Sequence, residues 1–157
     1  MSDGAALVRP ATPADLAGVA RVDHEVYGAE VYPAFFFRQA LDLWPDGLRV
    51  ADAGGAVVGY VLSAPSAREG EAWVLSLAVS ADARGRGVGG ALMLGALEAL
   101  ARGGAREVYL TASPANTGAV GLYHRLGFTT ERASPDHFGP GETRLLLRYD
   151  VPGATSP

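Results

Sequence analysis

A glycine-rich segment in the middle of the chain, residues 84–90, combines residue types that bind phosphate groups. It reads Arg-Gly-Arg-Gly-Val-Gly-Gly and lies between an expected strand, residues 73–79, and an expected helix, residues 88–102. A helix that begins there directs several backbone N–H groups and the positive end of its dipole toward one point. Glycines leave these amides accessible, and Arg84 and Arg86 can add charge-assisted hydrogen bonds to phosphate oxygens. The segment therefore predicts an anion site at a strand-to-helix turn.

Three known patterns of phosphate-binding turn can be compared with this segment. A P-loop needs a lysine and then a serine or threonine after its last glycine, whereas alanine and leucine follow here. The dinucleotide pattern G-x-G-x-x-G of nicotinamide and flavin proteins is matched by Gly85, Gly87 and Gly90. That turn follows the first strand of its unit and has an acid at the end of the next strand. Here the turn follows the fourth expected strand, and Glu107 lies at the start of the next one. The third pattern, Arg-x-x-Gly-x-Gly, begins at Arg84.

A second segment, residues 116–128, reads Asn-Thr-Gly-Ala-Val-Gly-Leu-Tyr-His-Arg-Leu-Gly-Phe. It opens an expected helix, and Asn116 suits the N-cap position of that helix. Tyr123 lies seven residues later, which is about two helical turns and therefore the same face. The Tyr123 hydroxyl could serve as a proton donor, or the ring could simply pack against the core.

Together the two segments resemble the two signature motifs of the GNAT superfamily of N-acetyltransferases, Gln/Arg-x-x-Gly-x-Gly/Ala and Asn-x-x-Ala-x-x-Leu-Tyr-x-x-x-Gly-Phe. The resemblance covers about residues 5–149 and is nearest in pattern to the protein N-terminal acetyltransferases of the ribosomal-protein-alanine type. It implies transfer of an acetyl group from acetyl-CoA to a primary amine by direct attack in a ternary complex. No acyl-enzyme is needed, which agrees with the absence of cysteine.

The resemblance also implies roles for individual residues. Tyr123 would be the general acid that protonates the leaving thiolate, and a backbone N–H near residues 77–79 would stabilise the carbonyl oxygen. The strand at residues 73–79 would splay from the strand at residues 108–112 and leave a V-shaped opening. The residues expected to bind acetyl-CoA are Leu77, Ala78, Val79, Arg84, Gly85, Arg86, Gly87, Val88, Gly89, Gly90, Asn116 and Tyr123.

Residues 28–37, Gly-Ala-Glu-Val-Tyr-Pro-Ala-Phe-Phe-Phe, resemble the substrate loop of protein N-terminal acetyltransferases. A protonated amine cannot attack, and an α-amino group has a pKa near about 8, so a base is needed. By this resemblance Glu30 would be that base, and Tyr32, Pro33 and Phe35 would line the acceptor site. The same aromatic side chains could instead pack against the neighbouring helix.

Three positions depart from those enzymes. His137-Phe138 stands where they carry a pair of tyrosines, and Thr111 stands where the ribosomal-protein-alanine enzymes carry a glutamate base. His137 is a candidate base or acceptor contact, or else an exposed loop histidine. The acceptor is therefore a protein N-terminus or a small-molecule amine. A non-catalytic acyl-CoA sensor on the same fold is a further alternative, and Tyr123 argues against it because a sensor needs no proton donor.

The composition excludes several other classes of protein. The 157 residues include no cysteine, which excludes disulfides, thiolate metal sites and a cysteine nucleophile. Three histidines lie far apart, so no metal is expected. A formal net charge of −4 argues against a nucleic-acid partner. No apolar run is long enough to span a membrane and the N-terminus does not read as a signal peptide, so a cytoplasmic protein is expected. A homodimer would be common for such a family.

Periodicity and glycine or proline punctuation predict elements in the order β-α-α-β-β-β-α-β-α-β-β. The expected ranges are 6–9, 16–27, 33–43, 48–51, 56–64, 73–79, 88–102, 108–112, 117–126, 128–132 and 143–149. This order predicts an α/β (α+β) three-layer fold like that of GNAT proteins, with a mixed, mostly antiparallel sheet of six to seven strands flanked by about four helices. Residues 1–150 are expected to form a single domain, and residues 151–157 a disordered tail.

The expected core draws on both the strands and the helices. An Asp-Ala-Gly-Gly turn at residues 52–55 is expected to join two of the strands as a hairpin. The continuous apolar strand at residues 73–79 is expected to be buried on both faces. The predicted core residues are Val57, Val58, Val61, Trp73, Leu75, Leu77, Leu92, Leu97, Val108 and Leu110.

Overall fold

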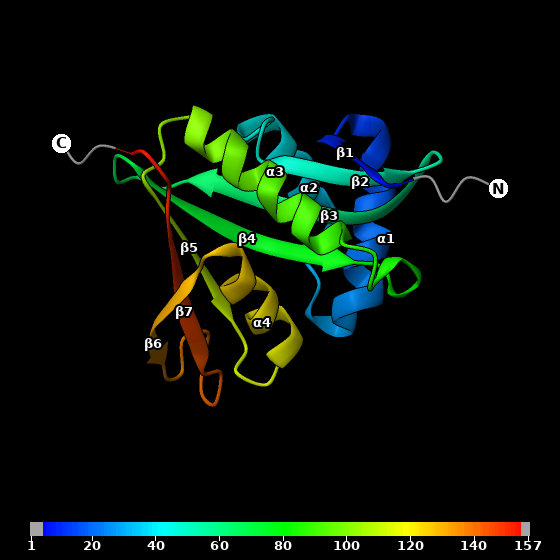
Figure 1. Cartoon of the computed structure of the whole chain (residues 1–157). Coiled ribbons are helices and arrows are strands. Elements are labelled where there is room, and N and C mark those ends of the chain that lie inside the picture. The colour runs from blue at the N-terminus through cyan, green and yellow to red at the C-terminus, as the bar shows by residue number, and fades with distance from the viewer. Residues whose placement is uncertain (1–4, 155–157) are drawn as a thin grey trace.

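A computed structural model describes residues 5–154, which form a seven-stranded sheet with four α-helices (Figure 1). The strands are β1 (Leu7–Pro10), β2 (Leu48–Ala53), β3 (Ala56–Pro65), β4 (Glu71–Val79), β5 (Glu107–Ala112), β6 (Thr129–Ser134) and β7 (Arg144–Asp150). The helices are α1 (Leu16–Tyr27), α2 (Ala34–Leu43), α3 (Val88–Arg102) and α4 (Thr117–Leu126). None of the helices in this part of the chain has the length and apolar character needed to cross a membrane.

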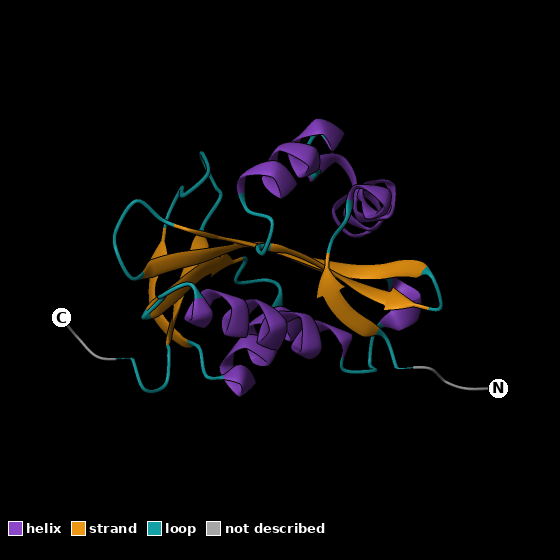
Figure 2. Ribbon diagram, turned by 90° about the horizontal axis from the view of Figure 1, so that it is seen from above, coloured by secondary structure: helices purple, strands orange, loops and turns teal. Residues whose placement is uncertain are grey.

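The order across the sheet is β1-β2-β3-β4-β5-β7-β6, and only β4 and β5 are parallel neighbours. Seen edge-on in Figure 2, the sheet lies between two layers of helices. Val19 of α1 and Phe37 of α2 are buried against one face, and Leu92 of α3 and Tyr123 of α4 are buried against the other. The predicted α+β three-layer fold with a mostly antiparallel sheet is confirmed.

The predicted order of elements is confirmed as well. Each α-helix begins and ends within one residue of its predicted range, and each strand within two residues. Three short 3-10 helices were not predicted, namely Pro13–Asp15, Gly28–Glu30 and Ala81–Ala83. Each contains only three residues, which is too short for a periodic apolar pattern.

The predicted core is mostly correct, with one clear exception. The buried members are Val57, Val61, Leu92, Leu97, Val108 and Leu110, and the half-buried members are Val58, Trp73 and Leu77. Leu75 is 36% exposed, so its assignment to the core is wrong. The register explains this, because Leu62 pairs with Ser76 and Ser63 pairs with Val74, which leaves Leu75 as the extra residue of a β-bulge.

The predicted burial of the strand at residues 73–79 on both faces is also wrong. Along β4 only Ala72, Val74 and Ala78 are buried, and the side chains between them are half-buried or exposed. A strand is covered on both faces only where helices and neighbouring strands enclose it. β4 lacks a neighbouring strand over most of its length on the β5 side.

β4 and β5 pair over a short stretch only. The parallel register joins Glu71 with Glu107, Ala72 with Val108 and Trp73 with Tyr109. Beyond these pairs the two strands diverge, as Figure 1 shows. The bulge lies at the start of the divergence, where the extra residue increases the local twist. The expected V-shaped opening is therefore present in the middle of the sheet.

The C-terminal segment remains hydrogen-bonded for a short distance beyond β7. The Val151 N–H donates to the Arg106 carbonyl at 2.9 Å, and the Ala154 N–H donates to the Val151 carbonyl at 3.2 Å. Of the tail that was predicted to be disordered, residues 155–157 lie outside the described residues.

Asp15 lies just before α1 and joins the first strand to that helix. Arg9 contacts the Asp15 carboxylate at 2.7 Å and Asp52 at 3.1 Å, and the Thr12 N–H donates to Asp15 at 2.8 Å. The Arg9 hydrogen bond above all holds the pKa of Asp15 at about 2, below its usual 3.8. Since the pKa is lower in the folded state, this stabilisation is present above about pH 4 and is lost as the pH falls toward 2. We expect Asp15→Asn to lower the free energy of unfolding at pH 7 by up to about 2 kcal/mol.

Urea unfolding at pH 7, 4 and 3 measures this contribution. The difference between the parent protein and Asp15→Asn should shrink as the pH falls through this interval. Asp42→Asn is the control, because its ion pair with Arg38 is exposed on α2 and should contribute less than about 1 kcal/mol. Equal losses in the two variants would contradict the assignment.

Candidate active site

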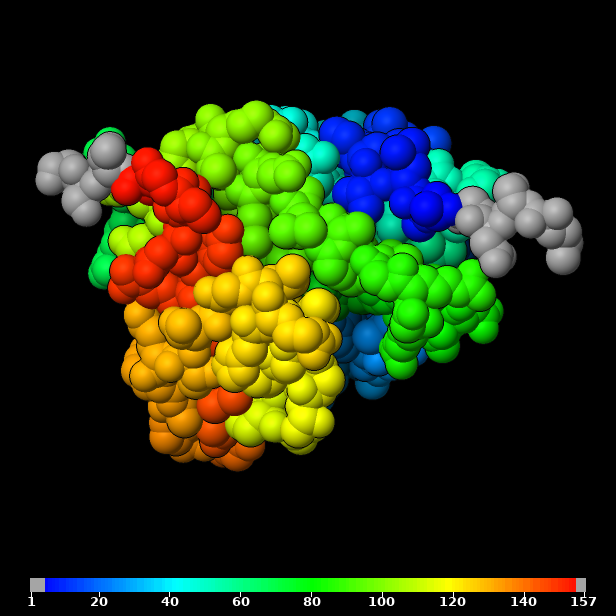
Figure 3. Space-filling view, viewed as in Figure 1, coloured from blue at the N-terminus to red at the C-terminus, as the bar shows by residue number. Residues whose placement is uncertain are grey.

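A cavity of about 360 Å³ opens where β4 and β5 diverge. Its walls come from α1 and the segment after it, from β4, from β5 with the start of α4, and from β7 with the loop before it. Figure 3 shows the surface hollowed between α4 (yellow) and the turn that precedes α3 (green). The polar residues that line the cavity are Asp23, Tyr27, Glu30, Tyr32, Ser76, Thr111, Ser113, Asn116, Tyr123 and Arg144.

The turn of residues 84–90 has the backbone geometry of an anion site. Gly85 and Gly87 both have φ of +78°, in the left-handed region that favours glycine, and Gly87 is the N-cap of α3. A Cβ added at either glycine would meet no atom of the described chain within 4 Å. The first hydrogen bond inside α3 runs from the Ala91 N–H to the Gly87 carbonyl, so the N–H groups of residues 88–90 have no partner within the helix. These donors and the open space above them form a cradle for an anion.

Two side chains brace this turn. Glu25 of α1 accepts hydrogen bonds from the Ala81 N–H at 3.1 Å and from the Ser80 hydroxyl at 2.9 Å, and these bonds lower the pKa of Glu25. Arg84 donates from Nε to the Val79 carbonyl at 3.2 Å. The bonds connect α1 and the end of β4 to the turn, so the anion cradle is held in place relative to the cavity.

The free edge of β4 faces the opening. Ala78 is paired with β3, and the Ser80 N–H donates to β3 at 2.8 Å. Backbone groups of successive strand residues point to alternate sides, so those of Leu77 and Val79 point away from β3. The Leu77 carbonyl accepts a hydrogen bond from the Tyr27 hydroxyl at 2.6 Å, and the Val79 carbonyl accepts the one from Arg84 Nε. The N–H groups of Leu77 and Val79 are thus directed to where a ligand can reach them.

Tyr123 forms part of the cavity wall on α4. Asn116 caps this helix as predicted, because its side-chain oxygen accepts the Ala119 N–H at 3.2 Å. The Tyr123 ring is 9% exposed and packs against Phe128, with centroids 5.9 Å apart. Burial raises the pKa of the Tyr123 hydroxyl to about 12, so this group keeps its proton at neutral pH. A protonated hydroxyl on the wall of a cavity can act as a general acid.

Asp23 of α1 is a buried carboxylate with partners of its own. It is 1% exposed and accepts the Tyr60 hydroxyl at 2.6 Å and the Tyr32 N–H at 3.0 Å. The Tyr60 hydroxyl also lies 2.8 Å from the Ser76 hydroxyl. Burial, reinforced by the Asp23 carboxylate, raises the pKa of Tyr60, so this hydroxyl stays a donor. A buried charge needs such partners, and here they also hold the segment before α2 against the sheet.

The sequence profile of the Acetyltransferase (GNAT) family matches residues 15–128, which include both the residue 84–90 turn and Tyr123. The chain belongs to this family. This GNAT protein is 31% identical over 153 residues to an N-alpha-acetyltransferase of Sulfolobus acidocaldarius, a match that covers 89% of each chain. The predicted resemblance to protein N-terminal acetyltransferases is confirmed, and the chain is an acyltransferase.

Solved structures of GNAT proteins agree with this assignment. Ard1 from Thermoplasma volcanium has a TM-score of 0.85 and 26% sequence identity, and the match covers 94% of this chain and 99% of that one. The fold is also that of yncA from Salmonella typhimurium, a putative acetyltransferase solved with its cofactor acetyl-CoA. Here the TM-score is 0.81 and the identity 19%, over 98% of each chain.

The GNAT fold brings some of the predicted acceptor residues into the cavity and leaves others outside. Glu30 and Tyr32 line the cavity. Pro33 lies at the start of α2 and does not line it, and Phe35 on α2 is 66% exposed. His137 is exposed in the loop before β7 and does not line the cavity either.

The predicted cofactor-binding residues divide in a similar way. Leu77, Asn116 and Tyr123 line the cavity, and residues 84–90 form the anion cradle next to it. The Ala78 side chain is 2% exposed and packs on the face of the sheet that α1 and α2 cover, away from α3 and α4. Its backbone pairs with β3. Its neighbours on β4, and not Ala78 itself, therefore face the opening.

Three ionisable residues of the cavity were missed by the sequence analysis. Asp23 and Tyr27 lie four residues apart on one face of α1, and the polar pair at this spacing was a signal that could have found them. Arg144 is the first residue of β7 and reaches the cavity from a part of the chain distant from both motifs. No local pattern marks it.

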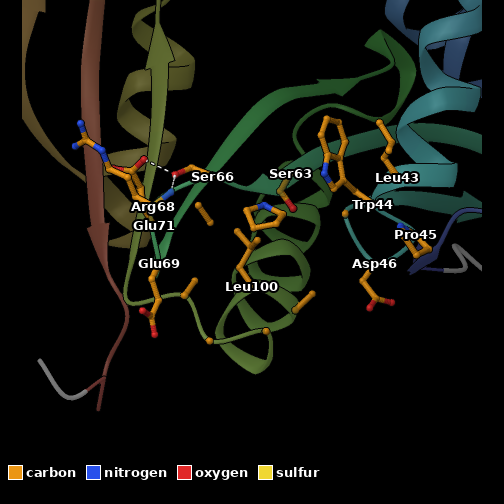
Figure 4. A pocket seen from close by; sticks show the side chains of 18 residues that line it. Leu43, Trp44, Pro45, Asp46, Ser63, Ser66, Arg68, Glu69, Glu71 and Leu100 are labelled. Atoms are coloured by element: carbon orange, nitrogen blue, oxygen red, sulfur yellow. Dashed lines mark hydrogen bonds between the residues drawn. The ribbon is translucent and has the colours of Figure 1, made fainter. Parts of the chain in front are cut away.

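A larger cavity, of about 510 Å³, lies at the other end of β4, between the C-terminal ends of α2 and α3 (Figure 4). Trp44 and Leu100 contribute apolar walls, and the Ser66 hydroxyl donates to Glu71 at 2.6 Å near its rim. No residue of either motif lines it. The candidate active site is the cavity of about 360 Å³, because Tyr123 and Leu77 of the free β4 edge both line it.

Proposed function

We propose that this chain transfers the acetyl group of acetyl-CoA to a primary amine by direct attack, with both substrates bound between β4 and β5. The observation that best supports this is the meeting of Tyr123, Asn116 and the free edge of β4 in one cavity. The anion cradle of residues 84–90 lies beside it. A protein that only senses acyl-CoA has no need of a buried hydroxyl that holds its proton, so the enzyme is favoured over the sensor.

The cradle fits the pyrophosphate of acetyl-CoA. Its backbone donors at residues 88–90 are free of partners within α3, and the space over Gly85 and Gly87 is open. Arg84 and Arg86 are exposed beside it and can pair with phosphate oxygens. The Salmonella protein of the same fold was solved with acetyl-CoA, which supports the same co-substrate here. When bound, acetyl-CoA supplies the activated acetyl thioester.

Tyr123 is the general acid in this proposal, because its hydroxyl holds a proton at neutral pH and lines the cavity. The N–H groups of Leu77 and Val79 would donate hydrogen bonds to an oxygen that gains negative charge. Such donors are effective because the strand fixes them before the reaction begins. The acid and the N–H donors thus lie on two walls of the same cavity, α4 and β4.

Glu30 is the proposed base, because it lines the same cavity as Tyr123. It would take a proton from the amine, directly or through water. We expect Glu30→Gln to lower kcat/KM for the amine by about a hundredfold and to leave the Kd for acetyl-CoA unchanged. Coenzyme A release and calorimetry measure the two quantities. Glu98→Gln, on the exposed face of α3, is the control, and equal rates in both variants would rule Glu30 out.

The function as a whole is tested with a panel of acceptor amines. The panel contains peptides with free or blocked N-termini, polyamines, amino acids and aminoglycosides, with coenzyme A release as the readout. Release with at least one amine, and none with blocked peptides, is expected. Calorimetry with acetyl-CoA and with NAD provides the second measurement, and binding of NAD alone would overturn the proposal.

A further inference from the structure

The guanidinium of Arg144 lies in the wall of the candidate active site and makes no ion pair with a carboxylate of the described residues. Arg144 begins β7 and lines the cavity. Its Nε is buried and has no hydrogen-bond partner among residues 5–154. The contact that the structure gives it is with the ring of Phe138, whose centroid lies 5.0 Å from Cζ.

Two arginines of the sheet are paired with carboxylates, whereas Arg49 of β2, like Arg144, has a buried Nε without a partner in the described part of the chain but does not line the cavity. Arg9 contacts two carboxylates, and Arg148 contacts Glu107, Glu131 and Asp150. Within the described residues no carboxylate lies within 4 Å of Arg144. Because Arg144 lines the cavity and has no carboxylate partner among its described residues, the Nη groups of its guanidinium can pair with an anion that enters the cavity.

The acids of the cavity are not available to Arg144. Asp23 is already bonded to the Tyr60 hydroxyl and the Tyr32 N–H. Glu30 lies on the segment after α1 and makes no ion pair with Arg144. The acceptor side therefore carries negative charge from the α1 segment and positive charge from β7. A ligand that complements both carries an amine and an anion.

We propose that Arg144 binds a carboxylate of the acceptor, so that the preferred substrates are amines that carry a carboxylate close to the amino group. This inference rests on the acetyltransferase function proposed above and names its substrate class. Carboxylate is the anion that the planar guanidinium fork matches through two parallel hydrogen bonds. The carboxylate can be the α-carboxylate of a free amino acid or the side chain of an acidic N-terminal residue in a peptide.

Matched pairs of acceptors test the proposal and separate the two sources. One pair is alanine and alaninamide, and the other is a peptide beginning with Asp and the same peptide beginning with Asn. In the parent protein we expect kcat/KM for the carboxylate member of one pair to exceed that for its partner by about tenfold or more. The pair that shows the preference identifies the source of the carboxylate.

Arg144→Gln should reduce this ratio to about one, and Arg144→Lys, which keeps the charge but not the fork, should retain part of it. Arg132→Gln is the control, because it removes a positive charge from the exposed face of neighbouring β6 and should keep the parent ratio. Acetyl-CoA binding by calorimetry verifies that each variant is folded. A parent ratio near one in both pairs, or an unchanged ratio in Arg144→Gln, would overturn the inference.

A binding measurement keeps this test separate from the proposed function. The probes are two pairs, N-acetylalanine with N-acetylalaninamide and the α-amide of N-acetylaspartate with the α-amide of N-acetylasparagine, each titrated into the protein saturated with coenzyme A. We expect the parent protein, but not Arg144→Gln, to bind the carboxylate member of one pair more tightly. Turnover of neutral amines with no preference within either pair of probes would refute the role of Arg144 and leave the enzyme function intact. Acetyl-CoA binding without turnover of any amine would instead remove the proposed function.

Discussion

Tyr123→Phe should lower kcat by at least about a hundredfold and leave the Kd for acetyl-CoA within about twofold of the parent value. The substitution removes only the hydroxyl, so the buried ring keeps its packing against Phe128. What is lost is the proton of the hydroxyl, whose pKa burial raises to about 12, well above neutral pH. Coenzyme A release under saturating substrates measures kcat, and calorimetry measures the Kd.

Tyr109→Phe is the matched control. Tyr109 also carries a raised pKa, of about 12, but through a hydrogen bond to Glu107 on β5, and it does not line the cavity. Its variant should turn over at the parent rate. The pH profile adds a second check, because an acid with a pKa of about 12 stays protonated and should cause no loss of rate between pH 7 and about pH 10. Equal kcat values in the parent and in Tyr123→Phe would eliminate Tyr123 as the acid.

Gly87→Ala should weaken acetyl-CoA binding by about tenfold or more, which corresponds to about 1.4 kcal/mol. Gly87 has φ of +78° at the N-cap of α3, and an added Cβ would enter open space above the cradle. In that space the methyl group would keep a phosphate away from the backbone donors. Calorimetry with acetyl-CoA and with free coenzyme A should report the same loss, since both carry the pyrophosphate.

Gly54→Ala separates the effect on binding from the effect on folding. Gly54 has φ of +62° in the exposed turn between β2 and β3, and a Cβ there also meets no atom within 4 Å. Both variants should lose a similar free energy of unfolding, about 1–2 kcal/mol, because alanine is strained in the left-handed region. Only Gly87→Ala should change the Kd. A parallel loss of binding in Gly54→Ala would mean that general destabilisation, and not the cradle, is responsible.

The elements of this fold could be predicted because their signals are local. The ends of α3 and α4 follow from Gly87, Asn116 and Gly127, which act at or next to the helix termini where they stand. The recurrence of apolar residues every three or four positions within each helix could be recognised in the sequence as well. By contrast, the exposure of Leu75 follows from its pairing with β3, which depends on a partner strand rather than on the residues beside it.

The candidate site was predictable on its cofactor side and much less so on its acceptor side. Residues 84–90 and Tyr123 belong to contiguous motifs, so their chemistry could be read along the chain. Arg144 and Asp23 are brought together only when β7 and α1 pack around the opening in the sheet. Phe35 has the aromatic character expected of an acceptor contact, but it lies in the first turn of α2 and is exposed. Residue type alone could not decide between these two environments.

The free edge of β4 also determines how easily another chain could add a strand to this sheet. An unpaired strand normally invites another chain to add a strand, because it offers alternating donors and acceptors. Here the Leu77 carbonyl is capped by the Tyr27 hydroxyl and the Val79 carbonyl by Arg84. An intruding strand would find donors without the acceptors that its own N–H groups require. The edge can therefore bind a ligand with its N–H groups while it resists β-strand addition, and two side chains from outside the strand provide this selectivity.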